Sequence, residues 1–151
     1  MARHILSDIY LFKAFTEDEL SALEAVAEPR TLSAGTVLFN EQDAADALLV
    51  VKFGSVQISQ SGDNNTVMLA TLGTGAHFGE VSFLDGEPRS ATARTMEQSE
   101  IVVISYAALK KYLDARPSAA VKFYREMALY LGSRLRTTTS DLNFSRARAR
   151  R

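Results

Sequence analysis

The sequence has no cysteine and only two histidines among its 151 residues. Without cysteine the chain can form no disulfide bond, no thiolate zinc site and no cysteine nucleophile, which fits a reducing compartment. Two histidines are too few for a typical metal site built without cysteine, so we expect no metal and no cofactor.

Long apolar runs and a strong net charge are missing as well. The first residues are too polar for a signal peptide, and no segment approaches the length of a membrane span. We therefore expect a soluble, cytoplasmic protein that does not contact a membrane. The net charge of −1 argues against a protein that coats nucleic acid with its whole surface. The length and the hydrophobic fraction of 46% are those of one ordinary globular domain.

Catalytic and dinucleotide motifs are incomplete. Gly73-Thr74-Gly75 is like the start of a dinucleotide fingerprint, but Phe78 stands where the third glycine belongs. The sequence has no P-loop, and no serine, histidine and carboxylate combine convincingly into a nucleophilic triad. His77 is interpreted as a packing or surface residue, with a general base as the alternative. We expect that the protein is not an enzyme.

The segment that begins at Thr16 is predicted to form a helix. Thr16 and Glu19 form a capping-box pattern, and apolar residues recur behind it at helical spacing. The helix is expected to end near Glu28, because Pro29 follows.

Residues 30–105 show a different pattern. Short apolar or alternating runs recur at a spacing of roughly ten residues, with turn signals between them. These runs lie around Val37, Leu48–Val51, Val56, Val67, Ala91–Thr95 and Ile101. No long helix alternates with them, so a parallel α/β sheet is disfavoured and a β-barrel or sandwich is predicted.

The chain then returns to helix. Residues 106–114 predict a short helix, and Pro117 suits the first turn of a second helix that runs to about residue 143. We therefore expect one domain over residues 1–143, with its β part at about 30–105. Residues 144–151 are expected to form a basic, mobile tail, and a tail that binds phosphate or a partner is the alternative.

The long helix carries two apolar faces. One set follows the three-and-four spacing of a coiled coil: Val121, Tyr124, Ala128, Leu131, Leu135, Thr138 and Leu142. The second set, Phe123, Met127 and Tyr130, lies on a neighbouring face. One face can pack on the chain's own β domain and the other on a second copy, which predicts a homodimer. A single wide stripe buried in one core is the alternative.

The most informative segment is residues 73–92, which holds Phe78-Gly79-Glu80-Val81-Ser82 and Pro88-Arg89-Ser90-Ala91. It resembles the phosphate-binding cassette of cyclic-nucleotide-binding domains, and the nearest likeness is to the bacterial catabolite activator protein group. Residues 41–56 resemble the family's second and third strands, and the likeness extends over about 20–142. The resemblance implies a mainly β fold, an antiparallel β-roll or jelly roll with N-terminal helices and a long C-terminal helix.

The resemblance also implies a role for each cassette residue. Glu80 would accept a hydrogen bond from the ribose hydroxyl, while Arg89 and Ser90 would bind the cyclic phosphate. Arginine suits this task because it stays charged and presents a fork of donors that matches two phosphate oxygens. Gly79 permits close backbone approach, and the amides of Ala91 and of a short turn at Val81 and Ser82 would face the anion. The alternative is that Glu80 and Arg89 form a structural ion pair.

The long helix would supply the base end of the site. Matching Arg134-Leu135 to the family's long helix places its hydroxyl pair on Thr138 and Thr139. In the family, the first contacts the adenine amino group and the second reaches the ligand held by the other subunit. The alternative is a frayed helix end at residues 137–139, because β-branched residues are weak helix formers. Ser90-Ala91 favours cyclic AMP, while a threonine hydroxyl could also serve cyclic GMP.

The sequence departs from the activator group after Leu142. Only nine residues follow, so this chain is expected to hold no helix-turn-helix domain and not to bind DNA directly by itself. A stand-alone sensor and a piece cut from a larger protein are the two alternatives. The predicted function is a cyclic-nucleotide sensor that signals through the C-terminal helix to an unidentified protein partner. Two hypotheses of other classes remain: a ligand-free dimerisation or docking module, and an enzyme on a cupin-like roll, which lacks the clustered histidines such sites use.

Overall fold

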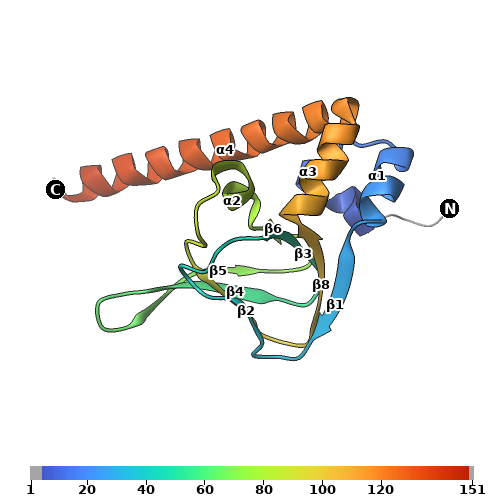
Figure 1. The fold of residues 1–151 in the computed structure, drawn as a ribbon. Helices are drawn as coiled ribbons and strands as arrows, with labels where there is room; N and C mark the ends of the chain where they lie inside the picture. Colours follow the sequence, from blue (N-terminus) through green and yellow to red (C-terminus); the bar gives the residue numbers. More distant parts are fainter. Residues whose placement is uncertain (1–4, 150–151) are drawn as a thin grey trace.

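The structure is a computed structural model that describes the backbone of residues 5–149 and the side chains of residues 6–140. In the described part of the chain, short helices come first, eight strands follow with one short helix between the sixth and the seventh, and two helices come last (Figure 1). The helices are η1 Ile5–Asp8, η2 Tyr10–Phe12, α1 Glu17–Glu24, α2 Glu80–Asp85, α3 Tyr106–Ala115 and α4 Pro117–Ala149. The strands are β1 Glu28–Leu32, β2 Val37–Phe39, β3 Ala47–Phe53, β4 Val56–Ser61, β5 Thr66–Leu72, β6 His77–Phe78, β7 Thr92–Thr95 and β8 Ser99–Ser105.

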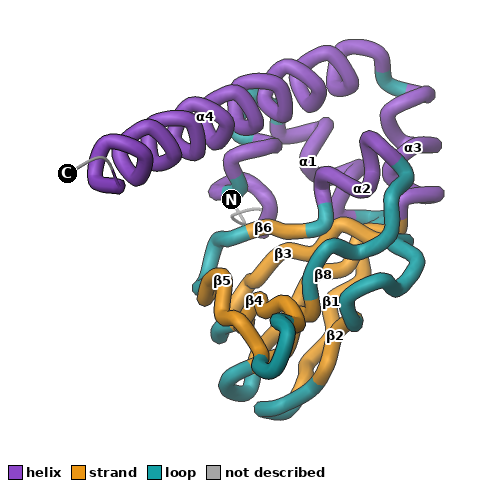
Figure 2. The backbone as a smooth tube through the Cα atoms, turned by 90° about the vertical axis from the view of Figure 1, so that its left-hand side faces the viewer, coloured by secondary structure: helices purple, strands orange, loops and turns teal. Residues whose placement is uncertain are grey.

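The strands form two four-stranded antiparallel sheets that together make a roll. One sheet has the order β1-β8-β3-β6 and the other β2-β7-β4-β5. The helices gather along one side of this roll, as Figures 1 and 2 show. The predicted fold class, an antiparallel β-roll with N-terminal helices and a long C-terminal helix, is confirmed.

Strand β3 is buried on both of its faces, which explains its continuous apolar run. Leu48 and Val50 point toward the helices and join one core cluster, whereas Leu49 and Val51 point into the roll and join another. Alternate residues of a strand face opposite sides, so a strand with two covered faces must be apolar throughout. β3 also pairs with β6, which places the cassette at its edge.

The first helix has the predicted start but ends early. Thr16 Oγ1 accepts a hydrogen bond from the Glu19 amide at 3.2 Å, and Glu19 Oε1 accepts one from the Thr16 amide at 2.8 Å. The helix ends at Glu24 rather than near Glu28, because Glu28 already belongs to β1 and pairs with β8. Pro29 is tolerated there since β1 is an edge strand.

The long helix α4 runs across the helical side and continues beyond it (Figures 1 and 2). It reaches Ala149, six residues past the predicted end at 143, so the expected mobile tail is helical to that point. Alanine and arginine, which alternate over residues 146–149, are both strong helix formers. Residues 150 and 151 of the predicted tail lie outside the described residues.

Burial separates the two apolar faces of α4. Phe123 and Met127 are fully buried in the core beneath the helix. From the other set, the side chains of Val121 and Leu135 are 68% and 67% exposed in the single chain. Leu131 is the exception, because it packs partly against the chain's own core. Between residues 5 and 149, no helix has an apolar stretch long enough to cross a membrane.

Phe123 joins three helical elements, which makes it a sensitive position. Its ring stacks on Phe12 of η2 at 6.0 Å and meets Phe83 of α2 edge-on at 5.9 Å. We expect Phe123→Ala to lower the free energy of unfolding by about 3–5 kcal/mol, since it empties a buried aromatic site. The control Leu129→Ala, on an exposed side chain of the same helix, should cost under about 1 kcal/mol. Urea unfolding measures both, and equal losses would contradict this packing.

Candidate ligand-binding site

A cavity of about 290 Å³ lies between the roll, α2 and α4. Its wall includes all eight predicted cassette residues: Phe78, Gly79, Glu80, Val81, Ser82, Arg89, Ser90 and Ala91. The strands β4 and β5 supply the apolar part of the wall, with Ile58, Leu69 and Leu72. Helix α4 adds Tyr130 and Arg134. The fold thus brings a cation, a carboxylate and an apolar surface to one small space.

Gly79 sits at the tightest point of the wall. Its φ of +89° lies in the left-handed region that favours glycine, and it immediately precedes α2. A Cβ atom on Gly79 would lie 2.6 Å from Arg89 Nη1 and 2.8 Å from the Ala47 carbonyl oxygen. The predicted helical turn over Val81 and Ser82 is present as part of α2.

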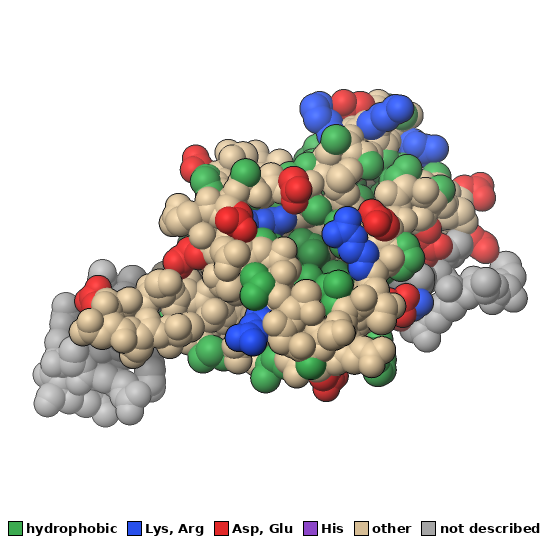
Figure 3. Space-filling view, turned by 60° about the horizontal axis from the view of Figure 1, so that its bottom comes forward, with side chains coloured by type: hydrophobic (Ala, Val, Ile, Leu, Met, Phe, Trp, Pro, Cys, Tyr) green, Lys and Arg blue, Asp and Glu red, His purple; other side chains and the backbone are tan. Residues whose placement is uncertain are grey.

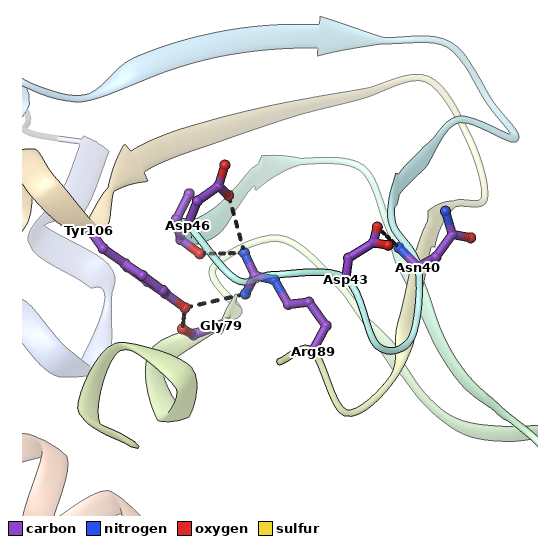
Figure 4. Close-up of polar contacts among 7 residues, drawn as sticks. Asn40, Asp43, Asp46, Gly79, Arg89 and Tyr106 are labelled. Carbon is purple, nitrogen blue, oxygen red and sulfur yellow. Dashed lines mark hydrogen bonds and ion pairs between the residues drawn. The ribbon is translucent and has the colours of Figure 1, made fainter. Parts of the chain in front are cut away.

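Arg89 is 4% exposed, so its charge is held inside the protein. Nη2 donates to the Ala47 carbonyl at 2.8 Å and Nη1 donates to the Tyr106 hydroxyl at 3.3 Å (Figure 4). Nη2 also lies 3.8 Å from an Asp46 carboxylate oxygen. Nε is buried and has no hydrogen-bond partner among the described residues. One N–H of the guanidinium is therefore left without an acceptor in the described part of the chain.

Aromatic rings complete the surroundings of the guanidinium. Arg89 Cζ lies 4.2 Å from the centroid of the Phe39 ring, a cation–π contact. The Tyr106 hydroxyl donates a hydrogen bond to the Gly79 carbonyl. Burial raises the pKa of Tyr106, although the nearby Arg89 charge opposes that rise. Tyr106 therefore stays a neutral hydroxyl that fixes the glycine and the arginine together.

Arg89 also borders a second cavity of about 240 Å³, on the side of Arg30 and Asp46. Figure 3 views the molecule with its lower side forward, where basic and acidic side chains surround a hollow floored by apolar ones. Arg89 therefore belongs to the wall of both cavities.

Glu80 is 3% exposed and pairs with His77, not with Arg89. The Glu80 Oε2 and His77 Nδ1 atoms are 3.4 Å apart, and within the described part of the chain neither has a hydrogen-bond partner. The alternative of a structural Glu80–Arg89 ion pair is therefore wrong, because α2 turns Glu80 toward β6 while Arg89 is drawn to Ala47. His77 is buried, with its ring 4.9 Å from that of Tyr130.

Three further predicted residues show different placements. Ser90 is exposed at the cavity, and its carbonyl accepts a hydrogen bond from Gln60 Nε2 at 2.8 Å. Thr138 and Thr139 are exposed on α4 and stand outside the cavity lining, because they lie a full helical turn beyond Arg134. Their contact with a base stays a prediction, and it needs a movement of α4 or a second chain.

Sequence reasoning missed several residues of the site. Asp46 and Tyr106 contact Arg89, and Tyr130 lines the cavity; they come from parts far apart in the chain, and nothing in their local pattern marks them as site residues. Arg134 had a local signal, since it belongs to the dipeptide used to align the long helix.

Fold and cavity together describe a ligand-binding β-roll, closed on one side by its own C-terminal helix. The family model for the cyclic nucleotide-binding domain matches residues 29–116, and the chain belongs to that family.

Relatives of the chain include proteins of different architecture. It is 32% identical over 149 residues to the cyclic AMP receptor protein of Thermus thermophilus, covering 93% of this chain and 65% of that protein. It is 30% identical over 118 residues to potassium channel AKT2 of rice, Oryza sativa subsp. japonica, covering 78% of this chain. The chain spans 14% of that channel's length.

A solved structure gives the same result for the fold. The N-terminal domain of a transcriptional regulator from Streptomyces coelicolor superposes with a TM-score of 0.79 at 30% sequence identity. The match covers 91% of this chain and 94% of that one.

The close approach at Gly79 can be tested against a second glycine. Gly79 and Gly86 both have positive φ, but a Cβ on Gly79 would meet other atoms inside 4 Å, whereas one on Gly86 would meet none among the described residues. We expect Gly86→Ala to cost about 1–2 kcal/mol from backbone strain alone. Gly79→Ala should cost clearly more, because it also displaces Arg89 or the Ala47 carbonyl. Thermal unfolding of the two variants compares them, and equal losses would refute the close approach.

Proposed function

We propose that the cavity binds cyclic AMP and that the domain is a sensor without catalytic activity. The observation that carries the proposal is the buried Arg89, which lines the cavity and whose Nε has no hydrogen-bond partner among the described residues, in a domain of this family. A buried cation with a free donor is costly unless an anion completes its hydrogen bonding. A cyclic phosphate is such an anion.

The two ends of the cavity suit the two ends of the ligand. Arg89 and Ser90 would bind the phosphate, helped by the amides of Ala91 and of the start of α2. Glu80 would accept a hydrogen bond from the ribose hydroxyl, and because it pairs with His77 it does not compete with the phosphate for Arg89. The base would lie against Ile58, Leu69 and Leu72, where the wall is apolar.

The choice of cyclic AMP over cyclic GMP rests on two supports. Ser90-Ala91 follows the arginine, a pair that resembles cyclic-AMP binders, and the Thermus thermophilus relative is named for cyclic AMP. Thr138 and Thr139 would contact the base only from a shifted α4 or from a second chain. A cyclic-GMP site remains the second candidate, because a hydroxyl can serve either base edge.

The function is tested by replacing the arginine and a matched control. We expect Arg89→Ala to weaken cyclic-AMP binding by at least about a hundredfold, because the charge-assisted bonds to the phosphate are lost. Arg94→Ala should leave the affinity within about twofold, since Arg94 is exposed and its Nε donates to the Gly35 carbonyl instead. Calorimetry with cyclic AMP, cyclic GMP and a cyclic dinucleotide gives the affinities, and circular dichroism checks the fold. Unchanged affinity in Arg89→Ala would reject this site.

We further propose that binding is signalled through α4 at the interface of a homodimer. Val121, Tyr124 and Leu135 form an apolar stripe that is exposed in the single chain, and stripes of this spacing pair with a second helix. A ligand that touches Tyr130 and Arg134 can favour one arrangement of α4 over another by its differential affinity. A ligand-free docking module would use the same stripe, but it would not need the cavity.

The dimer is tested by placing a charge in the stripe. We expect the wild-type chain to sediment as a dimer and Leu135→Glu as a monomer, because the new carboxylate would be buried without a partner. Leu129→Glu lies off the stripe and should remain dimeric. Analytical ultracentrifugation distinguishes the species, and a dimer that survives Leu135→Glu would place the interface elsewhere.

A further inference from the structure

His77 and Glu80 form a buried pair whose polar atoms are incompletely bonded. His77 is 8% exposed and Glu80 3%, and their facing atoms Nδ1 and Oε2 are 3.4 Å apart. Neither atom has a hydrogen-bond partner in the described part of the chain. A buried carboxylate is unfavourable unless it is neutralised or fully hydrogen-bonded. The imidazole is the group placed to do this.

We propose that His77 is a proton-linked positioning residue: it orients Glu80 for the sugar hydroxyl, and the pair takes up a proton when the cyclic nucleotide binds. The proposal rests on the function proposed above. His77 does not have to touch the ligand, because it acts through the Glu80 carboxylate. With a neutral imidazole, the anionic ligand enters a cavity whose wall already holds the Glu80 carboxylate, which forms no ion pair with Arg89. A protonated imidazole cancels that charge, so the bound state favours the protonated pair.

The other groups around His77 do not replace it in this role. The segments around His77 carry six charged or titratable side chains. Helix α4 carries Glu126, Tyr130 and Arg134, and the other three are Glu80 on α2, Lys13 just after η2 and Arg89 just before β7. Glu126 is already paired with Lys13 at 3.5 Å. Arginine side chains keep their charge over the working range of pH.

The direction of the pH effect follows from the proton count. The complex holds more protons than the free protein and ligand, so affinity is higher at low pH and falls as pH rises. We expect the affinity for cyclic AMP to fall several-fold over this rise in pH. The Tyr130 ring lies against the His77 ring, so helix α4 is in contact with the residue whose charge would change.

Proton uptake is measured directly by calorimetry of the full chain with cyclic AMP at about pH 7, in two buffers of different ionisation enthalpy. We expect net uptake for the wild type and none for His77→Gln. His77→Phe, which keeps a ring against Tyr130, gives the same test if the glutamine variant is unstable. His4→Gln is the matched control, because it removes the only other histidine and should leave the uptake unchanged. Uptake that survives the loss of His77, or disappears with His4→Gln, overturns the proposal.

A ligand lacking the hydroxyl separates positioning from general packing. We expect His77→Gln to weaken cyclic AMP about tenfold and 2′-deoxy cyclic AMP less than about twofold, because only cyclic AMP uses the Glu80 acceptor. Equal losses for both ligands would mean a merely structural role and overturn the proposal. Failure of the wild type to bind any cyclic nucleotide would instead remove the proposed function, and this inference with it. Binding without proton uptake would remove the inference alone.

Discussion

The buried guanidinium of Arg89 constrains much of the structure around it. A charge that is 4% exposed must be hydrogen-bonded, and the Ala47 carbonyl and the Tyr106 hydroxyl accept two of its N–H groups. Gly79 leaves the room these contacts require, since any Cβ there would collide with Nη1. Tyr106 ties the glycine carbonyl to the same arginine, so β3, the cassette and the start of α3 are fixed relative to one charge.

A second chain of contacts leads from the cavity to the long helix. Glu80 faces His77, the His77 ring lies on Tyr130, and Tyr130 meets Tyr10 at 5.9 Å. The two charged centres of the cavity thus have separate neighbours. Arg89 is anchored to the roll, whereas Glu80 is linked through aromatic contacts to α4. A ligand that touched both would connect the roll with the helix that carries the exposed apolar stripe.

The sequence was most informative where structure depends on near neighbours. The capping box at Thr16 and Glu19, the turn between β4 and β5, and the helix after Pro117 involve residues only a few positions apart. The predictions were wrong where contacts with distant segments decided the local structure. The first helix ends earlier than predicted because Glu28 pairs with β8 as part of a strand. Leu131 is not exposed with the rest of the predicted stripe because it packs partly against the chain's own core.

The sequence by itself determined the kind of site: a family cassette within residues 73–92, with a cation, a carboxylate and a glycine at their required positions. Only the tertiary structure decided which groups these side chains meet. Arg89 reaches Ala47 across 42 residues of chain, and α4 brings Tyr130 and Arg134 over the cavity from still farther away. The residue types of the cassette are visible in one short segment, because the functional groups belong to the side chains themselves. The contact partners of those side chains depend on the chain topology, which brings distant segments together.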